Sequence, residues 1–410
     1  MKYYVESYGC TMNFGEGRVL SEYMASMGHF EVCSAEEADI IVLNTCTVVE
    51  TTEKHMLSRI SELKKQGKDL IVTGCMAKAQ PRRIEIRLPD SPIIPPEDYN
   101  QFTDRIMERY GIVGNPQPIK STVDAILPIA QGCLGNCSYC ITKFARGDLR
   151  SYSHDELVER FKRFVEQGSK EILITAQDTA SYGRDTDTDL PALLKDMLST
   201  KGDFRVRLGM MNPNALERIS DALMDIMESD ERLYRFVHIP VQSASDGVLR
   251  NMRRQYRYED FKNLVLHLRS RIPEISIATD VICGFPGETD DDHIRTIEMM
   301  RDLRMDTVNI TRFSARPGTD AASMTPVHGR ISKDRSAELT NVKNETEGDV
   351  NKALLGRRFV VLATEHGKDG TITRTGNYRP IAIKDDIELG TFLEVEVVDS
   401  RPTYLLGKIV

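Results

Sequence analysis

The stretch Ile129-Ala-Gln-Gly-Cys-Leu-Gly-Asn-Cys-Ser-Tyr-Cys-Ile141 decides how the rest of the chain is organised. It begins at the end of the apolar run of residues 125–130, which is typical of a buried strand. Its three cysteines, Cys133, Cys137 and Cys140, follow C-x3-C-x2-C spacing on a glycine-containing loop. A closed structural zinc site takes four ligands, whereas three thiolates on one loop leave one iron of a cluster without a protein ligand. The loop is therefore a candidate for an iron–sulfur cluster with one open iron.

The spacing of these cysteines differs from the C-x2-C-x2-C run of bacterial ferredoxins, which argues against simple electron transfer. A zinc loop, or three unpaired buried cysteines, is the alternative. The motif resembles the signature of radical S-adenosylmethionine (SAM) enzymes. The resemblance implies that Cys133, Cys137 and Cys140 hold a [4Fe-4S] cluster whose open iron chelates the amino and carboxylate groups of SAM. An electron from that cluster would cleave SAM to a 5′-deoxyadenosyl radical.

The composition indicates an ordinary globular protein of two to four domains. The 410 residues are 40% apolar and 28% charged. No run approaches the ~18 consecutive apolar residues of a membrane span, and the first residues lack a signal-peptide pattern, so a cytoplasmic location is expected. Eight cysteines are spread along the chain, and in a reducing compartment such cysteines are more often metal ligands or redox groups than disulfides. The net charge of −8 gives no overall signal for nucleic-acid binding.

Residues 1 to about 110 alternate between strand and helix patterns, which predicts a parallel βαβαβ sheet. Strands are expected at residues 2–8, 39–44 and 69–73, and helices at residues 15–27 and 51–66, with a further helix after Pro81. Residues 89–96 contain four prolines and are expected to be irregular, and residues 111–122 to form a linker.

Three further cysteines each come directly after one of these predicted strands. Cys10, Cys46 and Cys75 lie 36 and 29 residues apart, close to the ~30 residues of one βαβ unit, which brings all three to the same carboxyl edge of the sheet. This indicates a second cluster with its own open iron. The alternative is three small buried residues at strand ends. Cys33 is out of phase with the repeat and is interpreted as structural.

The middle of the chain contains six strand patterns, each followed by a helical pattern, which predicts a partial (β/α)6 barrel rather than a closed eight-stranded one. The strands are expected at residues 126–130, 171–176, 204–208, 236–241, 275–282 and 307–313. Helices with apolar spacing are expected between them, including residues 156–165, 216–227 and 258–268.

Polar and glycine-rich segments follow several of these strands, at the ends where such barrels bind ligands. Gln177 and Asp178 are candidates to bind the SAM ammonium group, and Gln242 and Ser243 are candidate cofactor-binding residues after the fourth strand. The segment Cys283-Gly-Phe-Pro-Gly-Glu288 follows the fifth, where Glu288 is expected to cap the next helix and Cys283 to be a core residue. Plain turn chemistry is the alternative for each segment taken alone.

The last 60 or so residues predict a small five-stranded barrel, after a polar connection at residues 314–349 and a charged helix at residues 332–351. Short β-rich runs occur at residues 359–363, 371–374, 381–383, 391–398 and 404–409. From residue 350 onward there are nine Lys or Arg against eight Asp or Glu, so this end is the least acidic part. Its arginines at strand starts and turns are candidates to follow an RNA backbone, with an ordinary solvated surface as the alternative: Arg357, Arg358, Arg374 and Arg379.

With both cysteine triads in view, the chain resembles the methylthiotransferase family of radical SAM enzymes over its whole length. The matching segments are Tyr8-Gly-Cys-Thr-Met-Asn13, Asn44-Thr-Cys-Thr47, Thr73-Gly-Cys-Met76, Gly132 to Cys140 with Arg146-Gly147, Pro240-Val-Gln-Ser243, Gly284-Phe-Pro-Gly-Glu-Thr289 and Ser314-Ala-Arg-Pro-Gly318. The resemblance implies an N-terminal domain with an auxiliary cluster (residues 1–112), a radical SAM core (120–348) and a C-terminal TRAM domain (350–410).

The resemblance also implies the chemistry. Cys10, Cys46 and Cys75 would hold an auxiliary [4Fe-4S] cluster whose open iron carries a sulfur atom that one SAM methylates. The other triad would cleave a second SAM, and the radical would activate C2 of the substrate adenine to receive the methylthio group.

The segment Tyr8-Gly-Cys-Thr-Met-Asn13 and the compact N-terminus most resemble the archaeal and eukaryotic subgroup that acts on N6-threonylcarbamoyladenosine next to the anticodon in tRNA. Related subfamilies modify isopentenyladenosine in tRNA or an aspartate in a ribosomal protein, and an iron–sulfur RNA-binding protein without catalysis is a different class. The expected partners are the tRNA anticodon stem-loop, an electron donor and a sulfur donor, with no membrane.

Overall fold

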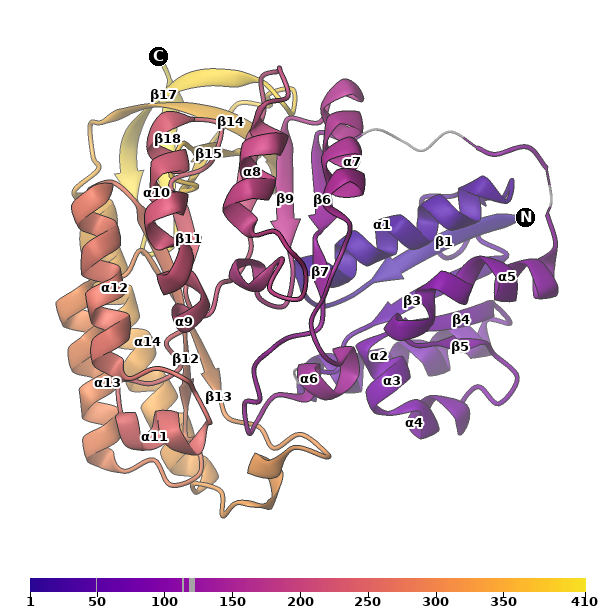
Figure 1. Ribbon diagram of the computed structural model, residues 1–410, viewed down its shortest axis with the longest axis horizontal. Helices are drawn as coiled ribbons and strands as arrows, with labels where there is room; N and C mark the ends of the chain where they lie inside the picture. Colours follow the sequence, from indigo (N-terminus) through magenta and orange to yellow (C-terminus); the bar gives the residue numbers. More distant parts are fainter. Residues whose placement is uncertain (49, 113, 118–121) are drawn as a thin grey trace. The chain divides into compact units, whose positions relative to one another are not determined.

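A computed structural model describes every residue of the chain except 49, 113 and 118–121 (Figure 1). The chain forms two compact units. The first comprises Met1–Ser121, Gln131–Arg150 and Ser314–Ala322, and the second comprises Thr122–Ala130, Ser151–Phe313 and Ser323–Val410. This division differs from the predicted boundaries after residues 112 and 348, which stay predictions. The predicted linker lies partly outside the described residues. Among the helices that are described, none combines the length and the apolar character needed to span a membrane.

The first unit is built on a five-stranded parallel sheet in the order β2-β1-β3-β4-β5. Its strands are β1 (Lys2–Ser7), β2 (Phe30–Glu31), β3 (Ile40–Thr45), β4 (Asp69–Gly74) and β5 (Ile93–Ile94). The three predicted strands are confirmed. Strand β5 lies within the stretch expected to be irregular, so that expectation is wrong at this point. Strands of two residues show no alternation in the sequence and therefore escape pattern analysis.

Helices cover both faces of this sheet, which explains why every residue of β3 is buried. Alternate residues of β3 point to opposite sides: Ile41 packs with Met56 of α2, and Val42 packs with Met24 of α1. The helices are α1 (Thr11–Ser26), α2 (Glu50–Lys65), α3 (Cys75–Ala79), α4 (Pro81–Glu85), η1 (Pro96–Gln101), α5 (Phe102–Tyr110) and α6 (Ile141–Arg146).

The second unit contains six parallel strands that follow one another in chain order. Two three-stranded sheets, β6-β9-β10 and β11-β12-β13, are joined by parallel bridges between Val206 and Leu233 and between Met210 and His238. Among the described residues β6 and β13 each pair with one neighbour only, so the barrel is open, as predicted. The strands are β6 (Asp124–Pro128), β9 (Glu171–Thr175), β10 (Arg205–Leu208), β11 (Phe236–His238), β12 (Ser276–Cys283) and β13 (Thr307–Arg312).

Helices run alongside these strands, and α10, α12 and α13 are seen beside them in Figure 1. The helices of this region are α7 (His154–Glu166), η2 (Thr179–Ser181), α8 (Leu190–Leu198), α9 (Pro213–Leu216), η3 (Glu217–Ile219), α10 (Ser220–Ser229), α11 (Asp246–Asn251), α12 (Tyr258–Arg271), α13 (Asp290–Leu303) and α14 (Gly329–Lys352). Three short elements lie where the chain passes from one unit to the other: β7 (Ala130–Gln131), β8 (Arg150–Ser151) and η4 (Asp320–Ser323).

The predicted small C-terminal barrel is confirmed. Five strands close in the order β14-β15-β16-β18-β17 around a core that includes Val361, Ile381 and Val395. They are β14 (Arg358–Gly367), β15 (Gly370–Thr375), β16 (Pro380–Ile383), β17 (Phe392–Ser400) and β18 (Leu405–Ile409).

This small barrel packs against the amino ends of the parallel strands in the same unit. Arg379 forms an ion pair with Asp306, which directly precedes β13. Asn377 donates to the carbonyl of Glu274, just before β12, at 2.9 Å, and Arg357 pairs with the Glu274 carboxylate at 2.7 Å. The Arg207 guanidinium lies 5.3 Å from the centroid of the Tyr378 ring. The contacts therefore place the small barrel at the amino ends of the strands, away from their carboxyl ends.

Two of the four arginines expected to follow RNA are occupied by these internal contacts. Arg379 is 12% exposed, and Arg374, which is 18% exposed, pairs with Glu365 and lies over the Tyr378 ring. These two arginines make contacts inside the protein, so the expectation that they follow an RNA backbone is corrected. Arg357 and Arg358 are about half exposed, and their role toward RNA stays a prediction.

Glu347 on α14 is a buried carboxyl that should make stability depend on pH. Its side chain is 1% exposed, and burial raises its pKa to about 7, although the Val308 N–H donates to it at 2.6 Å. The folded chain thus retains a proton that the unfolded chain releases near the ordinary pKa of 4.5. The contribution of this group to the free energy of unfolding is fully present below pH 4.5 and is lost as the pH rises through about 7. The total loss is roughly 3 kcal/mol.

We expect the Glu347→Gln variant to gain thermal stability relative to the parent as the pH is raised from about 5 to about 8. Differential scanning fluorimetry at both values measures the gain. Glu345→Gln, an exposed change on the same helix, is the control and should follow the parent. Equal midpoints for the Glu347→Gln variant and the parent across this range would contradict the assignment.

Candidate iron–sulfur and cofactor site

The structure brings the first predicted triad together at the carboxyl edge of the sheet in the first unit. Cys10 immediately precedes α1, Cys46 follows β3, and Cys75 is the first residue of α3 directly after β4. Cys46 and Cys75 are buried, whereas Cys10 is exposed. The three thiols thus come from three separate loops of one parallel sheet, as the spacing predicted.

Two glycines allow these loops to approach one another. A Cβ at Gly9 would lie 2.7 Å from Cβ of Cys46 and 2.8 Å from its Sγ, so a larger residue would push the loops of Cys10 and Cys46 apart. Gly74 has a φ of +84°, and its Cβ would lie 2.3 Å from the carbonyl oxygen of Thr45. Both positions therefore require glycine for close approach as well as for backbone conformation.

Asn13 on α1 ties the three strand ends to one another. Its Nδ2 donates to the carbonyl of Tyr8 at 2.8 Å and to the carbonyl of Thr45 at 2.9 Å. Its Oδ1 lies 3.9 Å from Sγ of Cys75. The side chain of Asn44 donates back to the Asn13 carbonyl at 2.6 Å. Asn13 is the last residue of the segment Tyr8-Gly-Cys-Thr-Met-Asn13, and the sequence points to its importance only through that motif.

Arg146 contacts this site, and the sequence did not reveal that contact. Its Nε donates to Sγ of Cys75 at 3.2 Å, and its Nη2 donates to Oδ1 of Asn13 at 2.7 Å. Nη1 forms an ion pair with Glu16 of α1, and both side chains are at most 4% exposed. Burial lowers the pKa of Arg146, but the nearby Cys75, Glu16 and Tyr99 groups raise it by more. The pKa of Arg146 therefore lies well above its usual value.

Burial and charge act in opposite directions on the thiols of this triad. Burial raises the pKa of Cys75 to about 11, and the Arg146 charge lowers it. Burial also raises the pKa of Cys46, and the Cys10 thiol adds to that rise. A metal binds the thiolate and displaces the proton, so a positive charge beside Cys75 favours the form that ligates.

The second triad lies on a tight loop of the same unit. The Gly135 N–H donates to Sγ of Cys133 at 3.2 Å, and a Cβ at Gly135 would lie 3.8 Å from Sγ of Cys137. Cys140 directly precedes α6, and burial together with Cys137 raises its pKa. A Cβ at Gly132 would lie 1.9 Å from the carbonyl oxygen of Asp148, so only glycine fits where the loop begins.

The segment Ser314–Ala322 braces both cysteine regions within the first unit. Arg316 is 5% exposed and pairs with Glu53, and it donates to Oγ1 of Thr47, the residue after Cys46, at 3.2 Å. The Ala321 N–H donates at 2.8 Å to the carbonyl of Ser138, which lies between Cys137 and Cys140. The matching segment Ser314-Ala-Arg-Pro-Gly318 is therefore a structural support.

Each triad offers an all-cysteine donor set, and its role as a cluster ligand set stays a prediction. Within the described ranges no three His, Cys, Asp or Glu side chains are grouped so as to hold one metal ion. A cluster spans several atoms and is held by thiolates from around it, which suits an all-cysteine donor set on converging loops. Cys283 is buried, as expected, whereas Cys33 is exposed, and its interpretation as a structural residue outside the sites stays a prediction.

The candidate SAM-binding residues lie at the carboxyl ends of β9 and β11 in the second unit. Gln242 has a φ of +67°, which is unusual for a residue with a side chain, and its buried Oε1 has no partner among the described residues. Its backbone joins the sheet, since its N–H donates to the Asp280 carbonyl at 2.8 Å. A strained residue with an unpaired buried acceptor is typical of a ligand site. Ser243 beside it is buried, and its Oγ accepts from the Ser245 N–H at 3.2 Å.

Asp178 is 3% exposed and already holds three donors: its carboxylate accepts from Nδ2 and N–H of Asn212 at 2.8 and 3.1 Å and from Oγ of Ser181 at 2.7 Å. Burial raises its pKa, and these hydrogen bonds lower it. The structure therefore shows Asp178 as an anchor of the loop after β9. Direct binding of SAM by Asp178 and by the half-buried Gln177 stays a prediction.

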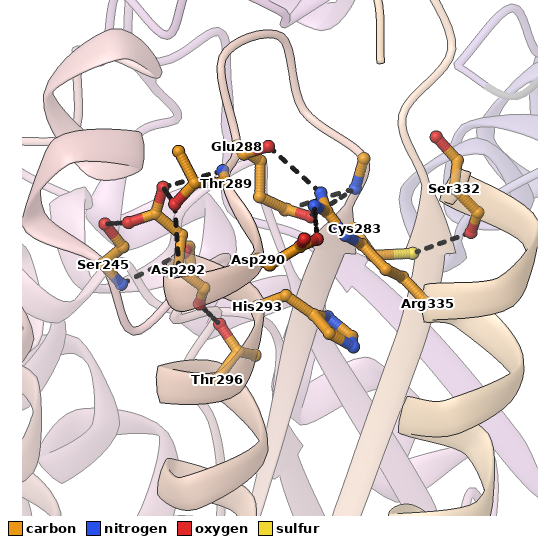
Figure 2. A network of polar contacts seen from close by, with 12 residues as sticks. Ser245, Cys283, Glu288, Thr289, Asp290, Asp292, His293, Thr296, Ser332 and Arg335 are labelled. Carbon is orange, nitrogen blue, oxygen red and sulfur yellow. Dashed lines mark hydrogen bonds and ion pairs between the residues drawn. The ribbon is translucent and has the colours of Figure 1, made fainter. Parts of the chain in front are cut away.

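The loop after β12 is ordered by a polar network, shown in Figure 2. Glu288 accepts from the N–H of Gly284 at 3.1 Å and pairs with Arg335 of α14 at 2.6 Å. Thr289, whose Oγ1 accepts from the Asp292 N–H at 3.2 Å, caps α13. The expectation that Glu288 caps this helix is wrong, because Glu288 turns back to its own loop and Thr289 takes the capping position.

Comparisons with known proteins give a family match for each of the two regions that carry the cysteine triads. Residues 127–300 match the radical SAM superfamily, and residues 2–94 match an uncharacterized protein family, UPF0004. A probable threonylcarbamoyladenosine tRNA methylthiotransferase from Pyrococcus horikoshii is 36% identical, with 100% of both chains covered. The threonylcarbamoyladenosine tRNA methylthiotransferase of Homo sapiens is 34% identical over 100% of this chain and 74% of the human protein.

Among solved structures, the fold is similar to that of TsrM, a radical SAM methyltransferase from Kitasatospora setae determined with cobalamin and a [4Fe-4S] cluster bound. The TM-score is 0.57 at 14% identity, and 78% of this chain and 76% of that chain are covered. At this identity the similarity concerns the fold alone.

Proposed function

This chain belongs to the threonylcarbamoyladenosine tRNA methylthiotransferases, a family of radical SAM enzymes, and from that premise we propose that it methylthiolates C2 of N6-threonylcarbamoyladenosine next to the anticodon in tRNA. The observation that carries the proposal is the presence of two all-cysteine triads within one compact unit. One triad suffices for SAM cleavage, whereas a second is needed where sulfur must also be delivered.

Radical SAM enzymes use SAM and a [4Fe-4S] cluster, and we assign that cluster to Cys133, Cys137 and Cys140. An auxiliary [4Fe-4S] cluster at Cys10, Cys46 and Cys75 is part of the proposal. When bound, the first cluster would supply the electron that cleaves SAM, and the auxiliary cluster would supply the sulfur that is transferred.

The chain's own residues hold and orient these groups. Gly9, Gly74 and Asn13 bring three loops together, and Arg146 places a donor on Cys75. Gln242 offers an unpaired buried acceptor, which suits the ammonium group of SAM, and Ser243 lies beside it. We assign Gln177, Asp178, Gln242 and Ser243 to the SAM pocket, Asp178 through the loop that it anchors.

The proposed partners follow from this reaction. The anticodon stem-loop of tRNA is the substrate, and the half-exposed Arg357 and Arg358 of the C-terminal barrel are the candidates to contact its backbone. Each turnover requires an external electron donor and sulfur to refill the auxiliary site. A tRNA substrate makes the cytoplasm the proposed location.

The proposal is tested by mass spectrometry of nucleosides. The reconstituted enzyme, SAM and a reductant are incubated separately with tRNA that carries N6-threonylcarbamoyladenosine and with tRNA that carries isopentenyladenosine. We expect the methylthio derivative of the first nucleoside only. Product from the second tRNA alone would assign the chain to the related subfamily, and 5′-deoxyadenosine without either product would refute tRNA as the substrate.

A further inference from the structure

We propose that Arg146 is a positioning residue that raises the reduction potential of the auxiliary cluster by donating a hydrogen bond to Sγ of Cys75. This inference rests on the proposed function, because it assumes that Cys75 ligates iron. It goes beyond that function by giving an electronic role to a residue outside both cysteine triads.

The contacts of Arg146 fix its guanidinium in one orientation. Each nitrogen has its own partner: Nε meets Sγ of Cys75 at 3.2 Å, Nη2 meets Oδ1 of Asn13 at 2.7 Å, and Nη1 pairs with Glu16. The Arg146 side chain is 1% exposed. A rigid planar guanidinium with three different acceptors cannot rotate away from the sulfur without breaking the other two contacts.

The charge balance of the pocket suggests that the sulfur matters to this arrangement. A buried Arg–Glu pair by itself gains little, because both ions lose their hydration. Here the Arg146 charge also faces Cys75, and Oε2 of Glu16 is buried without a partner among the described residues. With Cys75 as an iron-bound thiolate, Arg146 would compensate negative charge on both sides.

A hydrogen bond to a ligand sulfur changes the electron affinity of an iron–sulfur cluster. The reduced cluster carries one more negative charge than the oxidised one, so a donor and a positive charge at the sulfur favour reduction. The effect is strong in a site that excludes water, because the local dielectric constant is low. Removing Arg146 should therefore lower the potential.

The same helix connects Arg146 to the other triad. Cys140 directly precedes α6, and Arg146 is its last residue, about 9 Å further along at 1.5 Å per residue. Gly147 then ends the helix with a φ of +74°, and its carbonyl accepts from the N–H of Cys133 at 3.2 Å. The loop that holds one triad therefore also sets the position of the donor at the other.

The test uses full-length protein in which Cys133, Cys137 and Cys140 are all replaced by alanine, so that only the auxiliary cluster is reconstituted. Into this background we place Arg146→Met together with Glu16→Gln, which removes the hydrogen bond without leaving a buried unpaired carboxylate. The matched control is Arg59→Met with Glu6→Gln, because these two side chains form a partly buried pair in the same unit, with Nε–Oε1 at 2.9 Å. A redox titration followed by electron paramagnetic resonance measures the potential, and iron analysis measures occupancy.

We expect the Arg146 pair variant to keep its iron and to show a reduced-to-oxidised ratio about tenfold lower at a fixed potential, which is 59 mV for a one-electron couple. The Arg59 pair variant should match its background. An unchanged potential with full iron would overturn the inference and leave the proposed function intact. Loss of iron from the Arg146 pair variant alone would also overturn it, because Arg146 would then only hold the loop. If the background protein itself binds no iron, the auxiliary site of the proposed function fails instead.

Discussion

The Cys46→Ala variant should still convert SAM to 5′-deoxyadenosine while its methylthiolation of tRNA falls by more than about a hundredfold. Loss of a residue that only supports a metal ligand costs about 10–100-fold, and loss of a ligand should cost more. Cys46 belongs to the triad at the edge of the five-stranded sheet, whereas the proposed SAM-cleaving triad is formed on a separate loop by Cys133, Cys137 and Cys140. Chromatography of 5′-deoxyadenosine and mass spectrometry of nucleosides measure the two activities in one reaction.

The chain offers its own control for this experiment. Cys33 is exposed and lies outside both triads, so Cys33→Ala should retain both activities. Cys10→Ala should behave like Cys46→Ala, and because Cys10 is exposed, its replacement leaves no cavity. Sulfur insertion by the Cys46→Ala variant at the rate of the parent would remove the auxiliary cluster from the mechanism.

The second large effect concerns the other triad. We expect Cys133→Ala to lose 5′-deoxyadenosine formation and methylthiolation together, each by more than about a hundredfold. In the proposed assignment, the three thiolates of this loop hold the cluster whose fourth, open iron would bind SAM. The parent and the variant are compared after reconstitution, with iron content measured for each.

Cys283→Ala is the control for this variant, because Cys283 is a buried thiol of the second unit that lies outside both triads. It should retain both activities. The variant Cys133→Ala should also retain about half of the iron of the parent, since the other triad is unchanged. Continued production of 5′-deoxyadenosine by Cys133→Ala would refute the assignment of the triad.

Long elements with a clear apolar period were predictable from the sequence. The six strands of the open barrel and the five of the C-terminal barrel were identified because each is a run of apolar or β-branched residues between turn signals. The two-residue strands β2 and β5 were missed, since pairing with a neighbour, not local pattern, creates them. The placement of Cys10, Cys46 and Cys75 at one edge of the sheet was predictable because each directly follows a predicted strand, whereas their role as ligands stays a prediction.

Roles that depend on distant contacts were not predictable. Arg146 meets Cys75 across 71 residues of sequence, and no property of its own neighbourhood indicates that contact. The arginines of the C-terminal barrel show the opposite error, because a basic residue at a turn looks the same whether it meets RNA or a buried aspartate. Arg379 proved to pair with Asp306. Glu288 was misassigned by one position, since Thr289 competes for the same cap.

The small C-terminal barrel packs at the amino ends of the parallel strands, and this position sets the distance between its arginines and the proposed SAM pocket of the same unit. Gln242 and Ser243 lie beyond the opposite ends of these strands, and β12 alone is about 26 Å long at 3.3 Å per residue. If Arg357 or Arg358 holds an RNA, that RNA must extend along the strands of this unit before a base reaches Gln242 and Ser243. The distance between the bound part of the stem and the reacting nucleotide would then select the substrate, with little need to recognise the base sequence between them.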